Sequence, residues 1–187
     1  MKSTTLALAA ALALGGGLIG CTTAPETQTA KETLSDRAEV SLKAMERNNP
    51  EIRRVISRGF GYAIFPEVGK GGALVGGAFG RGEVYQEGKF VGYAKIEQAT
   101  VGAQVGGQSY DMLMVFENAE TMMKFKNNEW TGSANASAVI LKEGAGASTD
   151  FKNGVAVYVR PTGGAMAEAS LGGQKFSFEA ASKRSMD

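Results

Sequence analysis

Glycine is spread through the apolar part of this chain in a way that restricts the folds open to it. The sequence holds 26 glycines in 187 residues, about twice the usual share, and from Phe60 onward they alternate with Val, Phe, Tyr and Ile. Apolar β-branched and aromatic residues indicate buried strands, and glycines inside strands mark bends, bulges or close backbone contacts. We therefore predict a strongly bent, Gly-rich, mostly antiparallel β-sheet of barrel- or sandwich-like shape.

Two N-terminal helices are predicted to pack on this sheet, which gives an α+β fold. From about Ala30 to Arg47, apolar residues recur three or four positions apart and share one helix face. They are Leu34, Ala38, Leu42 and Met45. Asn49 and Pro50 predict the start of a second helix, which runs to about Ser57. We expect the apolar stripe to pack on the sheet, although such a stripe can also lie on lipid.

The rest of the chain predicts short strands, one turn and one short helix. The expected strands are 61–65, 72–85, 90–96, 99–106, 112–116, 134–141, 155–160, 165–171 and 175–178. Residues 86–89 have the composition of a hairpin turn, and Asn118 is a candidate cap for a helix at 119–126. Residues 69–72 are interpreted as a turn, either plain or with backbone amides that hold a phosphate.

The N-terminus has the pattern of a secretory signal. Lys2 precedes an uncharged apolar run from Leu6 to Ile19, which is shorter than the ~20 residues that span a bilayer as a helix. We predict a signal peptide at 1–20, a polar tether at 21–29 and a single domain at 30–187.

The residues Leu18-Ile19-Gly20-Cys21 resemble the lipobox of bacterial lipoproteins. This resemblance implies that Cys21 takes a diacylglyceryl group and that its new amine is acylated, for example with palmitate. Two or more acyl chains hold a protein stably on a membrane. Thr22 follows in place of the Asp that marks inner-membrane retention, so we expect the outer membrane, facing the periplasm.

The composition excludes most catalytic chemistry. The chain has no His and one Cys, so a Ser-His-Asp triad, a Cys-His pair and a His-ligated metal site are absent. The 20 basic and 19 acidic residues do not form the basic excess of a nucleic-acid-binding protein. We expect no enzymatic activity, no cofactor and no metal, and we interpret four carboxylates near strand ends as isolated surface groups. They are Glu83, Glu97, Asp111 and Asp150.

Several Gly-rich motifs, in order, resemble the SYLF-domain family. They are 61–66 with 69–72, 75–82, 99–108 and 163–176. The bacterial lipoprotein branch matches best, and the resemblance covers about Ala38 to Phe178. It implies lipid binding, because eukaryotic members bind phosphoinositides; yeast members also bind actin through adjoining regions. Residues 91–94 depart from the family, since eukaryotic members have Trp-Ser-Ala-Pro there.

Basic side chains are the candidates for contact with a lipid headgroup, because cations must meet its phosphate. Those in or beside the first long hairpin are Lys70, Arg81, Lys89 and Lys95, and a second cluster contains Arg53 and Arg54. Trp130 is expected in the core or under a lid, with membrane anchoring as the alternative.

Two functions remain open at this point. The first is a membrane-anchored periplasmic lipoprotein with a lipid-binding domain of SYLF type. The second is a structural or partner-binding envelope lipoprotein with no lipid ligand beyond its own anchor. The membrane and a phospholipid are the expected partners, and the sequence specifies no protein partner.

Overall fold

The computed structural model describes residues 22–72, 75–101, 107–130, 138–140, 151–164 and 174–182. The expected signal peptide at 1–20, Cys21, Asp150 and the expected strand 165–171 lie outside the described residues. Of the expected strand 134–141, only residues 138–140 are described.

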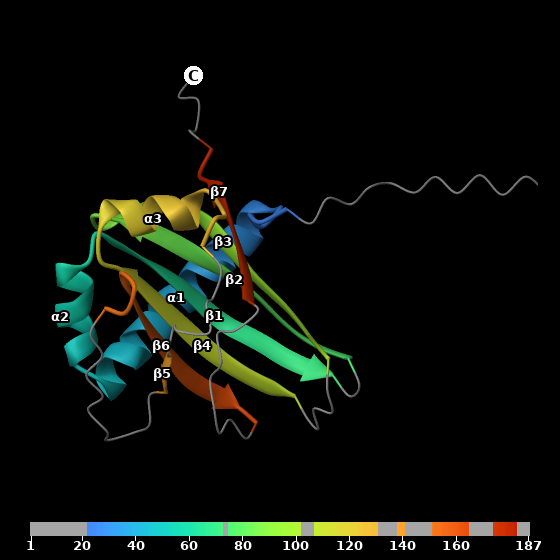
Figure 1. Ribbon diagram of the computed structural model, residues 1–187. Coiled ribbons are helices and arrows are strands. Elements are labelled where there is room, and N and C mark those ends of the chain that lie inside the picture. Colours follow the sequence, from blue (N-terminus) through green and yellow to red (C-terminus); the bar gives the residue numbers. More distant parts are fainter. Residues whose placement is uncertain are drawn as a thin grey trace, which may run out of the picture.

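Seven strands form one sheet in the order β5-β6-β4-β1-β2-β3-β7 (Figure 1). Their bounds are β1 Gly61–Gly72, β2 Val75–Gln86, β3 Lys89–Val101, β4 Gln108–Phe116, β5 Ala138–Ile140, β6 Val155–Gly163 and β7 Gln174–Ala180. All neighbouring pairs are antiparallel except β5 and β6. The sheet is bent. It is not closed, because β5 and β7 are its two edge strands in the described part of the chain.

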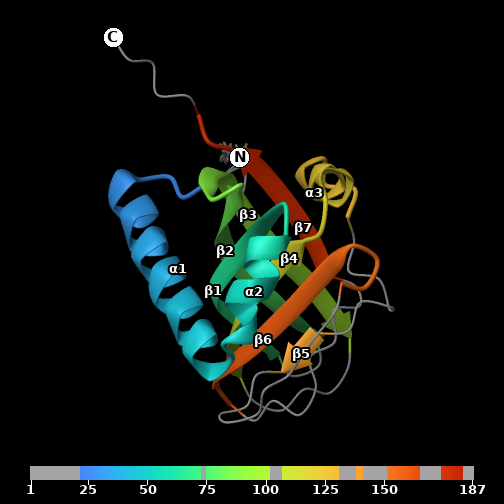
Figure 2. The same cartoon turned by 90° about the vertical axis from the view of Figure 1, so that its left-hand side faces the viewer.

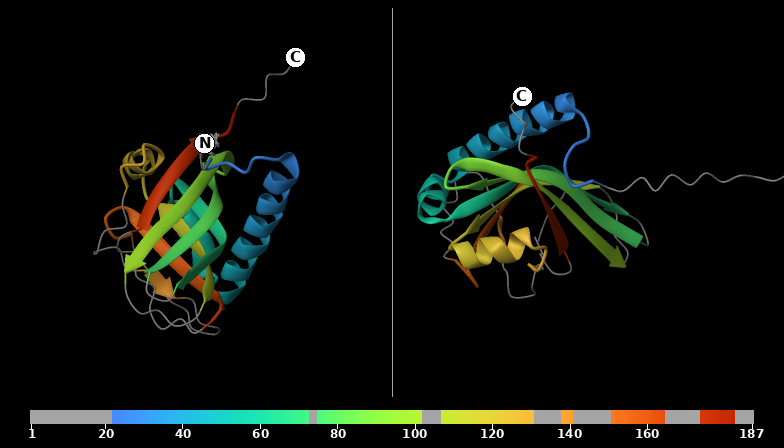
Figure 3. Two further views of the ribbon diagram at one scale, coloured as in Figure 1. Left: turned by 90° about the vertical axis from the view of Figure 1, so that its right-hand side faces the viewer. Right: turned by 90° about the horizontal axis from the view of Figure 1, so that it is seen from above.

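Helices cover both faces of the sheet. The long helix α1 (Gln28–Asn48) and the short helix α2 (Glu51–Arg58) lie on one face, whereas α3 (Ala119–Lys126) lies on the other (Figures 2 and 3). The expected α+β fold, with N-terminal helices packed on a mostly antiparallel sheet, is confirmed.

The core has one large part on each face. On the α3 side it is aromatic: Phe125 and Trp130 both pack against Phe176, with ring centroids 5.8 and 5.1 Å apart. Trp130 therefore lies at the edge of this core, as expected. On the other face, Met45 of α1 and Ile52 of α2 are fully buried in a cluster with residues of β1, β4 and β6.

The start and the inner face of α1 follow from its sequence. Thr27 caps the helix, because its side chain accepts a hydrogen bond from the Ala30 N–H at 3.1 Å. The residues of the predicted stripe that are buried against the sheet are Leu34, Ala38 and Met45. Packing of this stripe on the sheet is confirmed; Ser41 is buried on the same face.

Strand β1 differs from the expectation. Residues 69–72 are not a turn, because Gly69 and Lys70 pair with both β2 and β4. The strand continues through Pro66 by means of a bulge, at which Glu67 has φ +55°. A bulge is one of the few places where Pro is tolerated inside a sheet. A phosphate-holding turn at 69–72 is therefore ruled out.

The hairpin between β2 and β3 agrees with the prediction. Gln86 pairs with Lys89, and Glu87 and Gly88 take φ values of +50° and +75°, as in a two-residue turn. Strand β3 then continues to Val101 without a break. Residues 99–101 therefore belong to β3 and do not start the separate strand that was expected at 99–106.

Candidate functional site

The first described residues of the chain lie against the sheet. Thr23, Ala24 and Pro25 are buried, and the Ala24 N–H donates to Glu179 of β7 at 3.0 Å. The Thr22 carbonyl oxygen accepts a hydrogen bond from the Arg81 guanidinium at 3.4 Å. Of the residues expected to form the tether, Thr22 to Pro25 are therefore docked on β2 and β7, whereas 26–29 are exposed and α1 already begins at Gln28.

Arg81 lies beside this docked segment, in the middle of β2. Its side chain is on the α1 face of the sheet, next to Lys95, its cross-strand neighbour on β3. The guanidinium lies 5.5 Å from the ring centroid of Phe79, which is 47% exposed. The Arg81 Nε is buried without a hydrogen-bond partner, and among the described residues no carboxylate forms an ion pair with Arg81.

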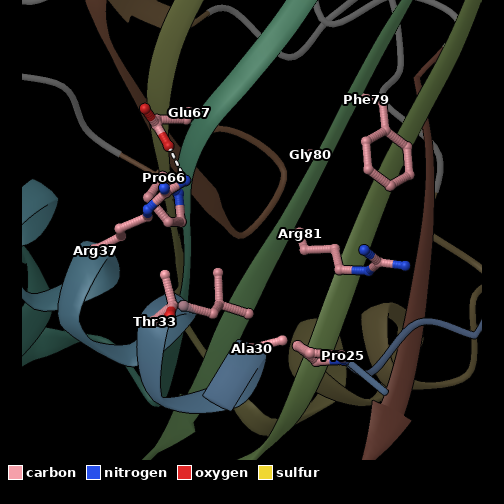
Figure 4. A pocket seen from close by; sticks show the side chains of 10 residues that line it. Pro25, Ala30, Thr33, Arg37, Pro66, Glu67, Phe79, Gly80 and Arg81 are labelled. Carbon is pink, nitrogen blue, oxygen red and sulfur yellow. Dashed lines mark hydrogen bonds and ion pairs between the residues drawn. The ribbon is translucent and has the colours of Figure 1, made fainter. Parts of the chain in front are cut away.

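A pocket of about 230 Å³ opens between Arg81 and α1 (Figure 4). Its lining is Pro25, Ala30, Thr33, Leu34, Arg37, Pro66, Glu67, Phe79, Gly80 and Arg81. Most of these side chains are apolar, and the cations Arg37 and Arg81 stand at its two sides. In Figure 4 the Arg81 side chain points away from Arg37. We call this cavity the first pocket.

A second pocket of about 320 Å³ adjoins it further along α1. It is lined by Asp36, Arg37, Val40, Ser41, Pro66, Glu67, Asp111, Arg160 and Thr162. The two pockets share Arg37, Pro66 and Glu67. Together they form one groove between α1 and the sheet, which we call the α1 groove.

Two ion pairs shape the α1 groove. Arg37 of α1 pairs with Glu67 at the bulge, and both side chains are more than half exposed, so this bridge adds little to stability. The second pair joins Arg160 of β6 to the buried Asp111 of β4. The other Asp111 oxygen accepts the Glu67 N–H at 3.1 Å, so Asp111 holds the bulge in place.

A buried carboxylate lies beneath α1 close to the groove. Glu83 is 3% exposed and accepts a hydrogen bond from the Tyr85 hydroxyl at 2.7 Å. Burial raises the pKa of the Glu83 carboxyl, and the hydrogen bonds from Tyr85 and Ser35 oppose that rise. The pKa of the Tyr85 hydroxyl is also raised, mainly by burial and further by Glu83. Glu83 lines neither the first nor the second pocket, so we interpret it as part of the packing of α1.

The predicted cations do not all gather at one place. Arg81 and Lys95 are adjacent, and Lys95 is buried in an ion pair with Glu97 at 3.2 Å. Lys89 is exposed at the hairpin turn, where β3 begins, and so lies away from Arg81 and Lys95. Lys70 lies near the far end of β1, where its side chain is outside the described residues.

The second predicted cluster is elsewhere. Arg53 and Arg54 lie on α2; Arg53 pairs with Glu46 of α1, and Arg54 pairs with Glu51 of α2. Both side chains are exposed, and neither lines the α1 groove. Their charges are matched by neighbouring carboxylates. Arg81 is the candidate cation that lines the α1 groove, and among the described residues it forms no ion pair with a carboxylate.

Among the polar residues of the α1 groove that sequence reasoning missed are Arg37, Ser41 and Arg160. Arg37 and Ser41 are four residues apart on the groove side of α1, but nothing in the sequence shows that a serine faces inward. Asp111 was expected to be an isolated surface carboxylate, and this was wrong, since it is 2% exposed and paired. Glu83 is likewise buried.

Other classes of site find no support in the described residues. No group of three or more His, Cys, Asp or Glu side chains there is placed to hold a metal ion. Among the helices described, none combines the length and apolarity needed to cross a bilayer.

Together, the fold and the pockets define a small α+β domain with a groove between its long helix and its sheet. The family model described as Las17-binding protein actin regulator (Ysc84) matches residues 97–186. The chain is also 26% identical over 156 residues to Beta cell expansion factor A of Aeromonas veronii. That match covers 82% of this chain but only 58% of the relative's length. These findings support membership of the SYLF family, which the motifs resemble.

Proposed function

We propose that this protein is a bacterial envelope lipoprotein whose SYLF domain binds phospholipid headgroups at the membrane that holds its anchor. Cys21 carries the anchor, and the outer membrane facing the periplasm is its location. The domain acts by binding and has no catalytic role. The proposal is supported by the SYLF resemblance and by the lipobox, and its residues come from the α1 groove.

The observation that carries the proposal is the position of Arg81. The Thr22 carbonyl oxygen accepts a hydrogen bond from the Arg81 guanidinium. Thr22 directly follows Cys21, and consecutive Cα atoms are about 3.8 Å apart, so Cys21 lies close to Arg81. An acylated Cys21 therefore places Arg81 at the level of the lipid headgroups. Arg81 is suited to this position, since its Nε lacks a partner and a guanidinium binds phosphate with directed hydrogen bonds.

Apolar side chains around Arg81 complete the site. Phe79 is exposed directly beside it, and Pro25 and Leu34 line the first pocket. Aromatic and aliphatic groups next to a cation suit the boundary between headgroups and acyl chains. A phosphate at Arg81 would thus have apolar contacts available for the lipid next to it.

Co-sedimentation with vesicles tests the proposal. The protein is used from Thr22 onward, so that no anchor contributes, with vesicles of phosphatidylcholine alone or mixed with phosphatidylglycerol. We expect binding to the anionic vesicles that weakens with salt. Arg81→Gln should weaken it about fivefold, since a cation near an anionic surface contributes about 1 kcal/mol.

Arg53→Gln is the matched control. It removes the same charge from an exposed site on α2 outside the groove, so its binding should stay close to that of the wild type. Equal losses in both variants would show that only net charge matters. Absence of binding to every vesicle would favour a structural or partner-binding lipoprotein.

A further inference from the structure

The sheet face that carries Arg81 continues onto the edge strand β7. Phe79 of β2 pairs with Glu97 of β3, and Glu97 pairs with Lys175 of β7. Residues that pair directly across antiparallel strands have their side chains on the same face, as do residues two positions apart in one strand. Arg81 lies two positions from Phe79 in β2, so all four side chains are on the α1 face of the sheet. We call this set the edge patch: Phe79, Arg81, Glu97 and Lys175.

The charges of the edge patch alternate from strand to strand. Glu97 forms an ion pair with Lys95 at 3.2 Å, and its side chain is 43% exposed. Lys175 is exposed, and in the part of the chain that the structure describes neither Lys175 nor Arg81 forms an ion pair. The patch therefore presents a cation on β2, a carboxylate on β3 and a second cation on β7.

The docked N-terminal segment leads toward the edge patch. The Ala24 N–H donates to Glu179 of β7, and the Thr22 carbonyl oxygen accepts from Arg81. In the strand register, Arg81 lies between the levels of Glu179 and Lys175. The segment thus approaches the level of Lys175 as it is followed back from Ala24 to Thr22. With the acylated cysteine of the proposed function directly before Thr22, the edge patch lies at the membrane end of the domain.

The spacing of the two cations indicates what they bind. Two strand separations and two residues along β7 place the Cα atoms of Arg81 and Lys175 about 12 Å apart. The Arg81 side chain points away from α1 (Figure 4), toward the segment that is docked on β7. A single phosphate midway between the cations would be repelled by the Glu97 carboxylate. Two phosphates, one at each cation, would flank Glu97, and a hydroxyl between them could donate to its carboxylate.

We propose that the edge patch binds a phospholipid in which two phosphates are joined by a hydroxylated glycerol, as in cardiolipin. Arg81 binds one phosphate and Lys175 binds the other, because charge-assisted hydrogen bonds to phosphate are strong. Glu97 accepts a hydrogen bond from the central hydroxyl, and the exposed Phe79 contacts the acyl chains. This inference rests on the proposed function and adds Glu97 and Lys175 to its site.

Titration with three short-chain lipids tests the inference. The mature, anchored protein in neutral detergent micelles is titrated by calorimetry with tetrahexanoyl cardiolipin, with its analogue that lacks the central hydroxyl and with dihexanoyl phosphatidylglycerol. Cardiolipin should bind at least about fivefold more tightly than phosphatidylglycerol, because it engages a second cation. The deoxy analogue should bind about fivefold more weakly than cardiolipin, the equivalent of one net hydrogen bond.

Three variants identify the residues responsible. Lys175→Gln should weaken cardiolipin binding about fivefold and leave phosphatidylglycerol binding unchanged, whereas Arg81→Gln should weaken both. Lys89→Gln is the control, because it removes the same charge from an exposed site at the hairpin turn, away from Arg81. Its affinities for both lipids should stay close to those of the wild type.

The outcomes separate the two proposals. Equal affinity of the wild type for cardiolipin and phosphatidylglycerol, or equal losses in Lys175→Gln and Lys89→Gln, overturns the two-phosphate site and leaves lipid binding intact. Equal affinity for cardiolipin and its deoxy analogue overturns the role of Glu97. Absence of binding to all three lipids contradicts the proposed function and the two-phosphate site together.

Discussion

Replacement of Asp111 by Ala is the most informative test of how the α1 groove is built. The Asp111 carboxylate is buried and has two partners: the Arg160 guanidinium, and the Glu67 N–H at 3.1 Å. The variant leaves both without their acceptor. It should therefore destabilise the domain and release the bulge that carries Glu67.

The size of the effect follows from the two partners. Loss of one member of a fully buried ion pair costs about 3–5 kcal/mol, but Arg160 is 25% exposed, so water replaces part of the lost attraction. The unpaired Glu67 N–H adds about 1 kcal/mol. We expect a loss of roughly 3 kcal/mol, which corresponds to a fall in Tm of several degrees for a domain of this size.

Urea unfolding followed by circular dichroism measures the free energy of unfolding. Asp111→Asn should lose less than Asp111→Ala, since the amide oxygen still accepts the Glu67 N–H. The control is Glu120→Ala, which breaks an exposed ion pair with Lys124 and should cost less than about 1 kcal/mol. A loss in Asp111→Ala no larger than in this control would refute the role assigned to Asp111.

Two further predictions concern the packing of β2. Burial raises the pKa of Glu83 above its ordinary value of 4.5, so the folded state loses stability as the pH rises through that range. Thermal unfolding should therefore show Glu83→Gln to be more stable than the wild type at pH 7, with the difference vanishing near pH 4; a constant difference would contradict this. At Gly82, an added Cβ would meet the Ile64 carbonyl and lie 2.7 Å from the Phe65 ring. Gly82→Ala should cost about 1–3 kcal/mol in urea unfolding, whereas Gly69→Ala, where nothing lies within 4 Å, should be close to neutral; similar losses at both would contradict the crowding argument.

Local signals account for the parts of the fold that the sequence predicts well. The stripe from Leu34 to Met45 repeats with helical period, and the Glu87-Gly88 turn needs residues that tolerate positive φ. Asn118 caps α3 by accepting the Thr121 N–H at 3.0 Å. Each of these features depends on neighbours within a few residues, so one sequence suffices to find it.

The course of β1 could not be predicted in the same way. Pro66 suggests the end of a strand, but the carboxylate of Asp111, 44 residues away from Glu67 in the chain, supports a bulge that lets β1 continue. Such a contact depends on strand order and register, which periodicity does not show. The pairing of β1 with β2 on one side and β4 on the other likewise depends on the arrangement of the whole sheet.

The candidate site shows the same limit. Arg81 was found because it is a cation in a Gly-rich hairpin, and its neighbour Lys95 follows from the register of that hairpin. Lys89 belongs to the same hairpin but lies at its turn, so proximity in sequence misled the grouping. Ser41 gave no signal, because a serine within an apolar stripe differs little from the alanine that could replace it.

Intact-mass analysis of the protein extracted from bacterial membranes is the most direct test of the central claim, that a lipid on Cys21 holds the domain against a bilayer. The account predicts a chain that begins at Cys21 and carries the added mass of a diacylglyceryl group and an N-acyl chain. A Cys21→Ser variant should lack these groups. A mature wild-type chain with an unmodified Cys21 thiol, or one cleaved at another residue, would contradict the account.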